Sequence, residues 1–200
     1  MSYWERVKPV RRVRALDPDA IARAAVGILD ASGFDGLSLR GLAQALGTAP
    51  ASLYSRVNGL ADALDLALDH ALAHDAAVQR AVREEEAAEI LLALYRHLLA
   101  HPWAVRVIAA RPPRGPAYLA FSEGLSARLG EPDAATPLWT AYAATNLVIG
   151  SALTRQAAQL EPRTPGDDEV APVYEELRRR GSDGPEDVLR QALHTLLGNA

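Results

Sequence analysis

The chain has 200 residues, of which 49% are hydrophobic and 23% are charged, and its formal net charge is −4. This composition is ordinary for a globular protein and suffices for one large domain, or for a small domain and a larger one. The absence of cysteine excludes a disulfide framework and thiol chemistry, and it fits a reducing compartment.

Nothing in the sequence predicts export or a membrane partner. Met1 is followed by polar and basic residues rather than by an apolar signal core. The longest apolar run, residues 138–153, contains several polar residues and is too short to cross a bilayer, so we expect a buried helix there. We therefore expect a cytoplasmic protein.

Charge is unevenly distributed along the chain. Residues 1–60 hold eight Arg or Lys against five Asp or Glu, a net charge of +3, whereas residues 61–200 hold thirteen against twenty, a net charge of −7. A positive end on an acidic body indicates that this end meets a polyanion.

The basic residues begin in residues 1–16, where Pro9 and the sparse apolar content predict a mobile arm. Such an arm is either a solubilising tail or a segment that follows DNA phosphates or enters the minor groove. The motif that follows it favours DNA. The arm residues that we expect to contact DNA are Arg11, Arg12 and Arg14.

A first helix is predicted to begin at Asp17-Pro18 and to end at Ser32-Gly33. Asp17 can accept hydrogen bonds from free amides of the first turn, and proline suits the first helical position. The apolar face comprises Ile21, Ala24, Ala25, Ile28 and Leu29. This helix would support the two helices that follow it.

Those two helices are short and are separated by a tight turn. The first spans residues 39–46 and ends at Gly47, which accepts a left-handed backbone. The second begins at Pro50 and runs to about Val57. Two such helices form a helix-turn-helix, whose second helix can enter the DNA major groove. The alternative is a packing motif in a protein that does not bind DNA.

The residues of this motif resemble the DNA-binding domain of the tetracycline-repressor (TetR) family. The resemblance covers about residues 17–70 and rests on G-L-S-L-R-x-L-A-x-x-L-G followed by L-Y-x-x-V. It implies that Arg40 faces DNA, although a solvated surface arginine is the alternative, and that the Tyr54 hydroxyl bonds a phosphate. The helix-turn-helix residues that we expect to contact DNA are Ser38, Arg40, Pro50, Ala51, Ser52, Tyr54, Ser55 and Arg56.

Two positions depart from the family pattern. Ala49 stands where many relatives have a capping Ser or Thr, a loss of about 1 kcal/mol unless Thr48 substitutes. Leu60 stands where the family usually has a Lys that contacts phosphate. The DNA-binding domain is expected to span residues 17–62, and a helical effector-binding and dimerisation domain is expected to span residues 63–200.

Two pairs of histidines lie four positions apart, which places each pair on one face of a helix. His70 and His74 fall in a helix predicted to run from Leu60 to about Val82, and His97 and His101 fall in the next helix. This is also a metal-ligand spacing, but no neighbouring carboxylate motif completes a site. We expect no metal and no cofactor, with metal binding as the alternative.

Further helices are predicted from apolar periodicity and end signals. They cover about residues 83–101, 103–110, 114–129, 138–160, 169–180 and 183–197, with a loop at 161–168. The stretch H-P-W…A-R-P-P-x-G-P resembles the C-terminal domain of the same family. No histidine precedes the Arg111-Pro112 turn, so a magnesium–tetracycline ligand is not expected.

The effector pocket and the dimer face are expected in this second domain. A mostly apolar pocket with few polar groups suits a small hydrophobic or aromatic effector. The candidate pocket residues, which alternatively only fill the core, are Tyr95, His101, Trp103, Tyr118, Phe121, Trp139, Tyr142 and Asn146. The candidate dimer residues, with the same alternative, are Leu147, Ile149, Leu153, Leu189, Leu193 and Leu196.

Together these features predict an all-α homodimer without catalytic residues: an N-terminal three-helix DNA-binding domain and a C-terminal helical ligand-binding domain. The resemblance implies a repressor that a small effector releases from a palindromic double-stranded DNA operator. Two alternatives remain, a metal-dependent enzyme that uses the histidine pairs and a helical interaction protein that no longer reads DNA.

Overall fold

The computed structural model describes residues 3–4, 16–110, 115–130, 136–160, 169–180 and 184–198. Within these ranges every regular element is helical, as the sequence predicts. The arm residues Arg11, Arg12 and Arg14 and the loop predicted at 161–168 lie outside the described residues.

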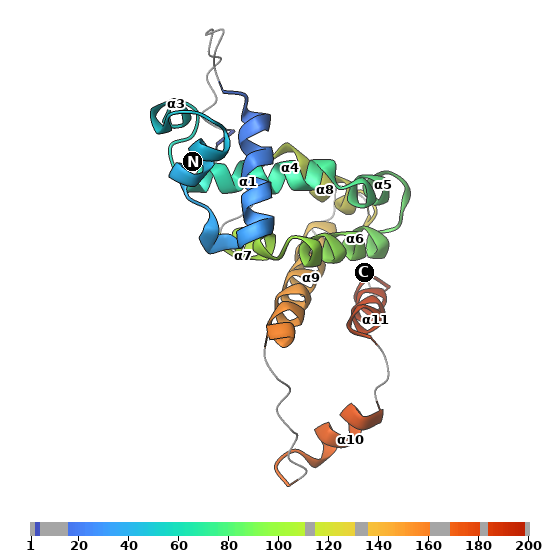
Figure 1. Ribbon diagram of the computed structural model, residues 1–200. Coiled ribbons are helices and arrows are strands. Elements are labelled where there is room, and N and C mark those ends of the chain that lie inside the picture. Colours follow the sequence, from blue (N-terminus) through green and yellow to red (C-terminus); the bar gives the residue numbers. More distant parts are fainter. Residues whose placement is uncertain are drawn as a thin grey trace.

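The first three α-helices form a small cluster at one end of the molecule (Figure 1). Helix α1 (Pro18–Ser32) begins at Asp17, whose carboxylate accepts a hydrogen bond from the Asp19 amide at 3.1 Å. A single 3-10 turn, Phe34–Gly36, leads to α2 (Leu39–Ala45) and α3 (Pro50–Tyr54). Gly47 between the last two helices has φ +60°, which is the left-handed turn that its position predicts.

The apolar core of the molecule extends into this cluster. Leu42 of α2, Leu53 of α3 and Val57 are fully buried, so they hold the two short helices against each other and against α1. Their burial turns the opposite faces of α2 and α3 outward. Helix α3 is shorter than predicted, because the regular helix ends at Tyr54 rather than near Val57.

The prediction of one helix from Leu60 to Val82 is wrong. The chain forms α4 (Leu60–His74) and α5 (Ala76–Glu84), with Asp75 between them in an extended conformation. The Asp75 carboxylate accepts hydrogen bonds from the amides of Ala77 at 2.9 Å and Val78 at 3.1 Å, and thereby caps α5. Its other oxygen lies 2.8 Å from Nδ1 of His97, a contact that fixes the break.

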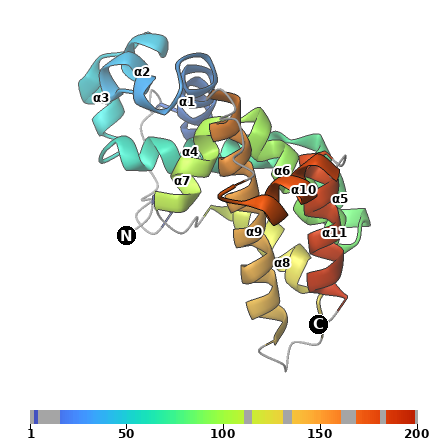
Figure 2. The ribbon, with the colours of Figure 1, turned by 90° about the horizontal axis from the view of Figure 1, so that it is seen from below.

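Most of the remaining helices build the larger part of the molecule around α6 (Ala87–Ala100), whereas α10 (Pro172–Arg180) lies away from α6 (Figures 1 and 2). The others are α7 (Pro102–Ala110), α8 (Pro116–Ser126), α9 (Thr136–Leu160) and α11 (Pro185–Leu197). Helix α6 buries apolar residues on nearly all sides because α5, α9 and α11 pack around it. Two salt bridges connect α11 to α6, Arg96–Glu186 and Arg190–Glu89.

The two parts are connected mainly through α4. Helix α1 packs extensively against α4. On α1, the Asp30 carboxylate accepts a hydrogen bond from Trp103 Nε1 at 2.6 Å and lies 2.7 Å from His101 Nδ1. At the other end of α4, the Asp69 carboxylate accepts a hydrogen bond from the Ala117 amide of α8 at 2.7 Å. Helix α4 therefore contacts both the N-terminal cluster and the helices that surround α6.

Among the described helices, none combines the length and the apolar character that crossing a bilayer requires.

Candidate DNA-binding surface and effector cavity

Helix α2 begins at a solvent-exposed cap. Ser38 is the N-cap residue, and its Oγ accepts a hydrogen bond from the Gly41 amide at 3.1 Å. Arg40 follows in the first turn with its side chain exposed. This end of the helix carries free amides and a positive partial charge, which suits a phosphate.

The outward face of α3 lies beside this cap. Pro50, Ala51, Ser52 and Ser55 are exposed, and the Ser55 hydroxyl donates a hydrogen bond to the Ser52 carbonyl at 2.7 Å. Tyr54 is 56% exposed although it is aromatic. The Tyr54 ring and hydroxyl are therefore accessible to a partner from the same side as the exposed serines.

Arg56 differs from the other residues expected at DNA. It is half-buried, and within the described residues its Nε has no hydrogen-bond partner although it is shielded from solvent. Only part of its guanidinium is therefore accessible from the α3 surface. Seven of the eight helix-turn-helix residues expected at DNA are exposed, and Arg56 is the one that is partly enclosed.

Tyr3 is a residue that sequence reasoning missed. It falls in the segment predicted to be a mobile arm, yet its side chain is buried in the core and packs edge-on against Trp4 at 5.7 Å between ring centroids. Burial raises the pKa of the Tyr3 hydroxyl, and the positive charge of Arg56 opposes this effect. Two consecutive aromatic residues, Tyr3 and Trp4, in an otherwise polar segment are the sequence feature that could have predicted this burial.

The two departures from the family pattern have structural counterparts. Ala49 is the N-cap of α3, and among the described residues no side-chain capping bond is formed there. Leu60 opens α4 and packs partly against the apolar core. The first turn of α4 is held instead by Asp62, whose carboxylate accepts a hydrogen bond from the Asn58 amide at 2.9 Å.

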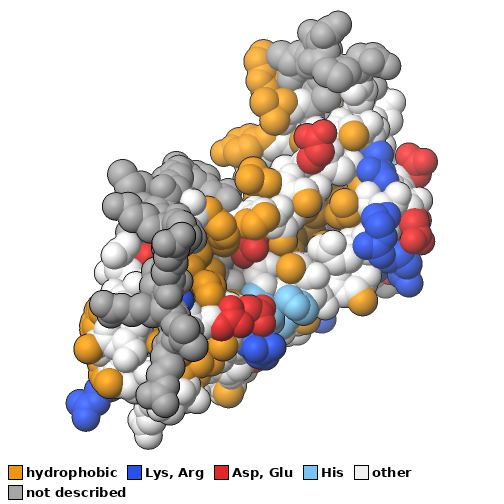
Figure 3. Space-filling model, turned by 90° about the horizontal axis from the view of Figure 1, so that it is seen from above, with side chains coloured by type: hydrophobic (Ala, Val, Ile, Leu, Met, Phe, Trp, Pro, Cys, Tyr) orange, Lys and Arg blue, Asp and Glu red, His pale blue; other side chains and the backbone are white. Residues whose placement is uncertain are grey.

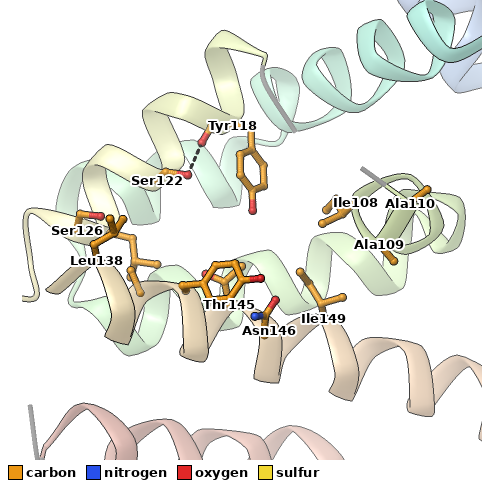
Figure 4. A pocket seen from close by; sticks show the side chains of 13 residues that line it. Ile108, Ala109, Ala110, Tyr118, Ser122, Ser126, Leu138, Thr145, Asn146 and Ile149 are labelled. Carbon is orange, nitrogen blue, oxygen red and sulfur yellow. Dashed lines mark hydrogen bonds between the residues drawn. The ribbon is translucent and has the colours of Figure 1, made fainter. Parts of the chain in front are cut away.

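A cavity of about 540 Å³ lies between the end of α7, helix α8 and the first half of α9 (Figure 4). Three of the predicted pocket residues line it: Tyr118, Tyr142 and Asn146. The lining residues that sequence reasoning did not single out are Ile108, Ala109, Ala110, Ser122, Leu125, Ser126, Leu138, Ala141, Thr145 and Ile149.

The other five predicted pocket residues lie elsewhere. Tyr95 and Trp103 are buried in the core, and His101 is engaged with Asp30. Phe121 is buried and is not among the lining residues, and its ring centroid lies 5.9 Å from that of Tyr118. Trp139 is 69% exposed on the outer side of α9, one position from a lining residue but on another face of the helix.

Polar groups in the cavity are few. Figure 4 shows the Tyr118 ring and the Asn146 amide directed into the space between α8 and α9. The Ser122 hydroxyl donates to the Tyr118 carbonyl at 3.0 Å, so its proton is already engaged. Burial raises the pKa of the Tyr118 hydroxyl, and nearby Tyr142 adds to this effect, so the phenol stays neutral and available as a donor. The cavity suits an apolar molecule with one or two polar groups.

The predicted dimer residues differ in their exposure. Leu147 and Leu153 are exposed on α9, with Trp139 on the same helix. Leu189 and Leu193 are buried, because α11 packs against α6 and α9 of the same chain. Ile149 lines the cavity, and Leu196 is half-buried against the core.

Comparisons with known proteins relate the chain to transcriptional regulators. No protein-family model matches the chain. The chain is 36% identical over 158 residues to an HTH-type transcriptional regulator of Saccharopolyspora erythraea, an alignment that covers 75% of this chain and 66% of that protein. It is 41% identical over 109 residues to the HTH-type transcriptional repressor DrrR1 of Streptomyces coeruleorubidus, covering 50% of this chain and 38% of that one.

Solved structures extend the likeness to nearly the whole chain. The TetR family protein ActR of Streptomyces coelicolor, in complex with (S)-DNPA, superposes with a TM-score of 0.71 at 26% identity over 92% of this chain and 96% of ActR. The all-helical architecture, the helix-turn-helix and the sequence likeness to regulators agree. The chain thus belongs to the TetR family, whose members are transcriptional regulators and not enzymes.

Proposed function

We propose that the protein is a ligand-responsive repressor that acts in the cytoplasm and binds a palindromic DNA operator as a homodimer. The observation that carries this proposal is the outward face of α2 and α3. Arg40 and Tyr54 are exposed on it, while Leu53 on the opposite side of α3 is fully buried. The core thus holds the polar face in solvent, where a major groove can receive it.

Each exposed residue suits a part of the duplex. The Arg40 guanidinium can grip guanine or a phosphate, and the methylene groups of Pro50 and the methyl of Ala51 can contact thymine methyls. Tyr54 would donate its hydroxyl to a phosphate. Ser38 already accepts the Gly41 amide, so its hydroxyl proton stays available for a phosphate. The basic residues Arg11, Arg12 and Arg14 would add contacts along the backbone.

The effector would occupy the cavity between α7, α8 and α9. Its volume of about 540 Å³ falls in the range of small-molecule sites. The apolar lining favours a compact hydrophobic or aromatic compound, and Tyr118 and Asn146 would orient one or two polar groups on it. ActR, which has a similar fold, is known in complex with (S)-DNPA, and DrrR1 is a repressor.

The route from cavity to DNA surface would run through α8 and α4. Asp69 of α4 accepts the Ala117 amide at the start of α8, and α4 packs along α1. An effector that prefers one position of α8 would favour one position of α4 and therefore one spacing of the two DNA-binding domains. DNA binds best at one spacing of the two domains. By linkage, an effector that binds more tightly at a different spacing must weaken DNA binding.

The DNA proposal is tested by recovering bound fragments from a random duplex pool. A palindromic sequence should be enriched, with half-sites about one helical turn apart or slightly more. The Arg40→Ala variant should bind that sequence at least tenfold more weakly, whereas Arg80→Ala, at an exposed position of α5, should bind like the wild type. Recovery of no sequence, or equal loss in both variants, would contradict the proposal.

The cavity is tested with the neutral aromatic probe N-phenyl-1-naphthylamine. The wild type should bind one probe per chain with enhanced fluorescence. Ala109→Trp places a large side chain at an exposed lining position and should weaken probe binding several-fold, whereas Ala77→Trp on α5 should not. Equal binding by both variants would exclude the cavity as the probe site.

A further inference from the structure

His70 and His74 form a stacked pair on α4. Their ring centroids are 3.9 Å apart and the ring planes are inclined by 28°. Nδ1 of His74 lies 2.8 Å from the backbone carbonyl of His70, so Nδ1 carries the proton and donates it, and Nε2 of His74 keeps its lone pair. A histidine fixed by its Nδ1–H to a carbonyl is the usual arrangement of a metal-ligating imidazole.

The carboxylate that the sequence pattern lacks comes from another helix. Asp19 in the first turn of α1 places Oδ1 2.9 Å from Nδ1 of His70, although the two residues are about fifty positions apart in the chain. One ligand atom from each of Asp19, His70 and His74 lies within 4.8 Å of the others. In the view of Figure 3, histidine side chains lie beside acidic side chains on the surface of the molecule.

The dimensions fit a transition-metal ion. Ligand atoms bound to tetrahedral Zn²⁺ at about 2.0–2.1 Å lie about 3.3 Å from each other. Side-chain rotations that close the remaining separation are inexpensive, because Asp19 and His74 are exposed. Two imidazoles and one carboxylate suit Zn²⁺ and its neighbours in the first transition row rather than Mg²⁺ or Ca²⁺. Three protein ligands leave one position for water.

The charged residues around Asp19, His70 and His74 do not oppose the binding of a metal ion. Arg23 forms an exposed pair with the other oxygen of Asp19 at 3.2 Å, an interaction that contributes little and does not involve Oδ1, the oxygen beside His70. The adjacent carboxylate of Asp69 is engaged with the Ala117 amide and points toward α8. The imidazole of His70 is mostly buried, with 13% of its side chain exposed, so packing of α1 on α4 holds it in place.

We propose that Asp19, His70 and His74 bind one divalent transition-metal ion of the Zn²⁺ class, which links α1 of the DNA-binding domain to α4. The ion joins the helix that supports the helix-turn-helix to the helix that contacts α8. A bound ion therefore stabilises the junction across which an effector signal has to pass, and it does so at a site separate from the cavity between α7, α8 and α9.

The test is calorimetric titration of metal-stripped, full-length protein with ZnCl₂. The wild type should bind one Zn²⁺ per chain, and its Tm should rise as Zn²⁺ is added. His74→Ala and Asp19→Asn change exposed residues, so both variants should fold, and each should bind Zn²⁺ at least tenfold more weakly. The matched control is His194→Ala, which removes an exposed histidine of α11 and should leave the titration unchanged.

Three results would overturn the proposal. The first is that the wild type takes up no Zn²⁺. The second is that His74→Ala and His194→Ala bind Zn²⁺ equally. The third is that Asp19→Asn binds like the wild type, because α1 would then supply no ligand. A loss in both His74→Ala and Asp19→Asn, with His194→Ala unchanged, supports the site independently of whether DNA binding has been shown.

Discussion

Asp75 shows how one side chain decides the path of the backbone. The surrounding residues are good helix formers, and their apolar pattern continues through position 75, so local propensity predicts one helix. The helix is interrupted at this position. There the Asp75 carboxylate caps α5 and pairs with His97 of α6, two interactions that it would not make inside a continuous helix. His97 lies in a different helix, so a single sequence gives no indication of this contact.

The same contact predicts a pH dependence of stability. The hydrogen bond from His97 lowers the pKa of Asp75 from 3.8 to about 2. A carboxyl group with a depressed folded-state pKa stabilises the fold above its unfolded pKa, and this stabilisation is lost as the pH falls from about 4 toward 2. With the partial exposure of Asp75 taken into account, the contribution is about 1–2 kcal/mol.

Chemical denaturation of wild type and Asp75→Asn between pH 2 and pH 6 measures this contribution. Asparagine keeps a capping oxygen but loses the charge, so the variant should be less stable at pH 6, and the gap should narrow as the pH falls. Asp35→Asn serves as a control, because Asp35 is exposed and its pair with Arg106 lies at the surface. A constant gap across this range would refute the assignment of the depressed pKa.

At the scale of elements, the sequence predicts best what local signals determine. Asp17-Pro18 and Ser32-Gly33 mark both ends of α1 correctly, and Gly47 marks the turn between α2 and α3. Proline marks the starts of α8 and α11, at Pro116 and Pro185. These signals act within a few residues of the helix end, so a single sequence is enough to detect them.

The start of α4 carries a second prediction. Leu60 stands where the family usually has a phosphate-contacting Lys, so Leu60→Lys should restore one contact to the DNA backbone. Operator affinity should rise at low salt, and the slope of log K against log[salt] should become more negative by about 0.9. Leu64→Lys, one turn further along α4, is the control. An unchanged slope in Leu60→Lys would place the start of α4 away from the phosphates.

At the scale of the whole molecule, the sequence could not place the cavity or complete the histidine cluster. Both depend on which helices pack together. Aromatic residues such as Tyr95 and Trp103 are as suitable for a pocket as Tyr118 by composition, and only the packing of α7, α8 and α9 separates them. Asp19 likewise reaches His70 because α1 packs against α4.

The exposed apolar residues of α9 predict how two chains associate. Trp139 and Leu153 are large, apolar and exposed in the single chain, which is typical of a surface that a partner covers. Leu153→Glu places a charge on that surface and should shift the protein from dimer to monomer in sedimentation velocity. Leu119→Glu, at an exposed position of α8, should remain dimeric. A dimeric Leu153→Glu variant would move the interface away from this part of α9.

The measurement that tests the DNA-binding surface most directly is fluorescence anisotropy of the selected operator over a range of salt concentrations. Wild type should bind with two chains per palindrome and weaken steeply as salt rises. Tyr54→Ala should bind at least several-fold more weakly at every salt concentration, and Tyr174→Ala, which removes another exposed tyrosine, on α10, should match the wild type. Binding by Tyr54→Ala that equals wild type, or binding indifferent to salt, would contradict the account.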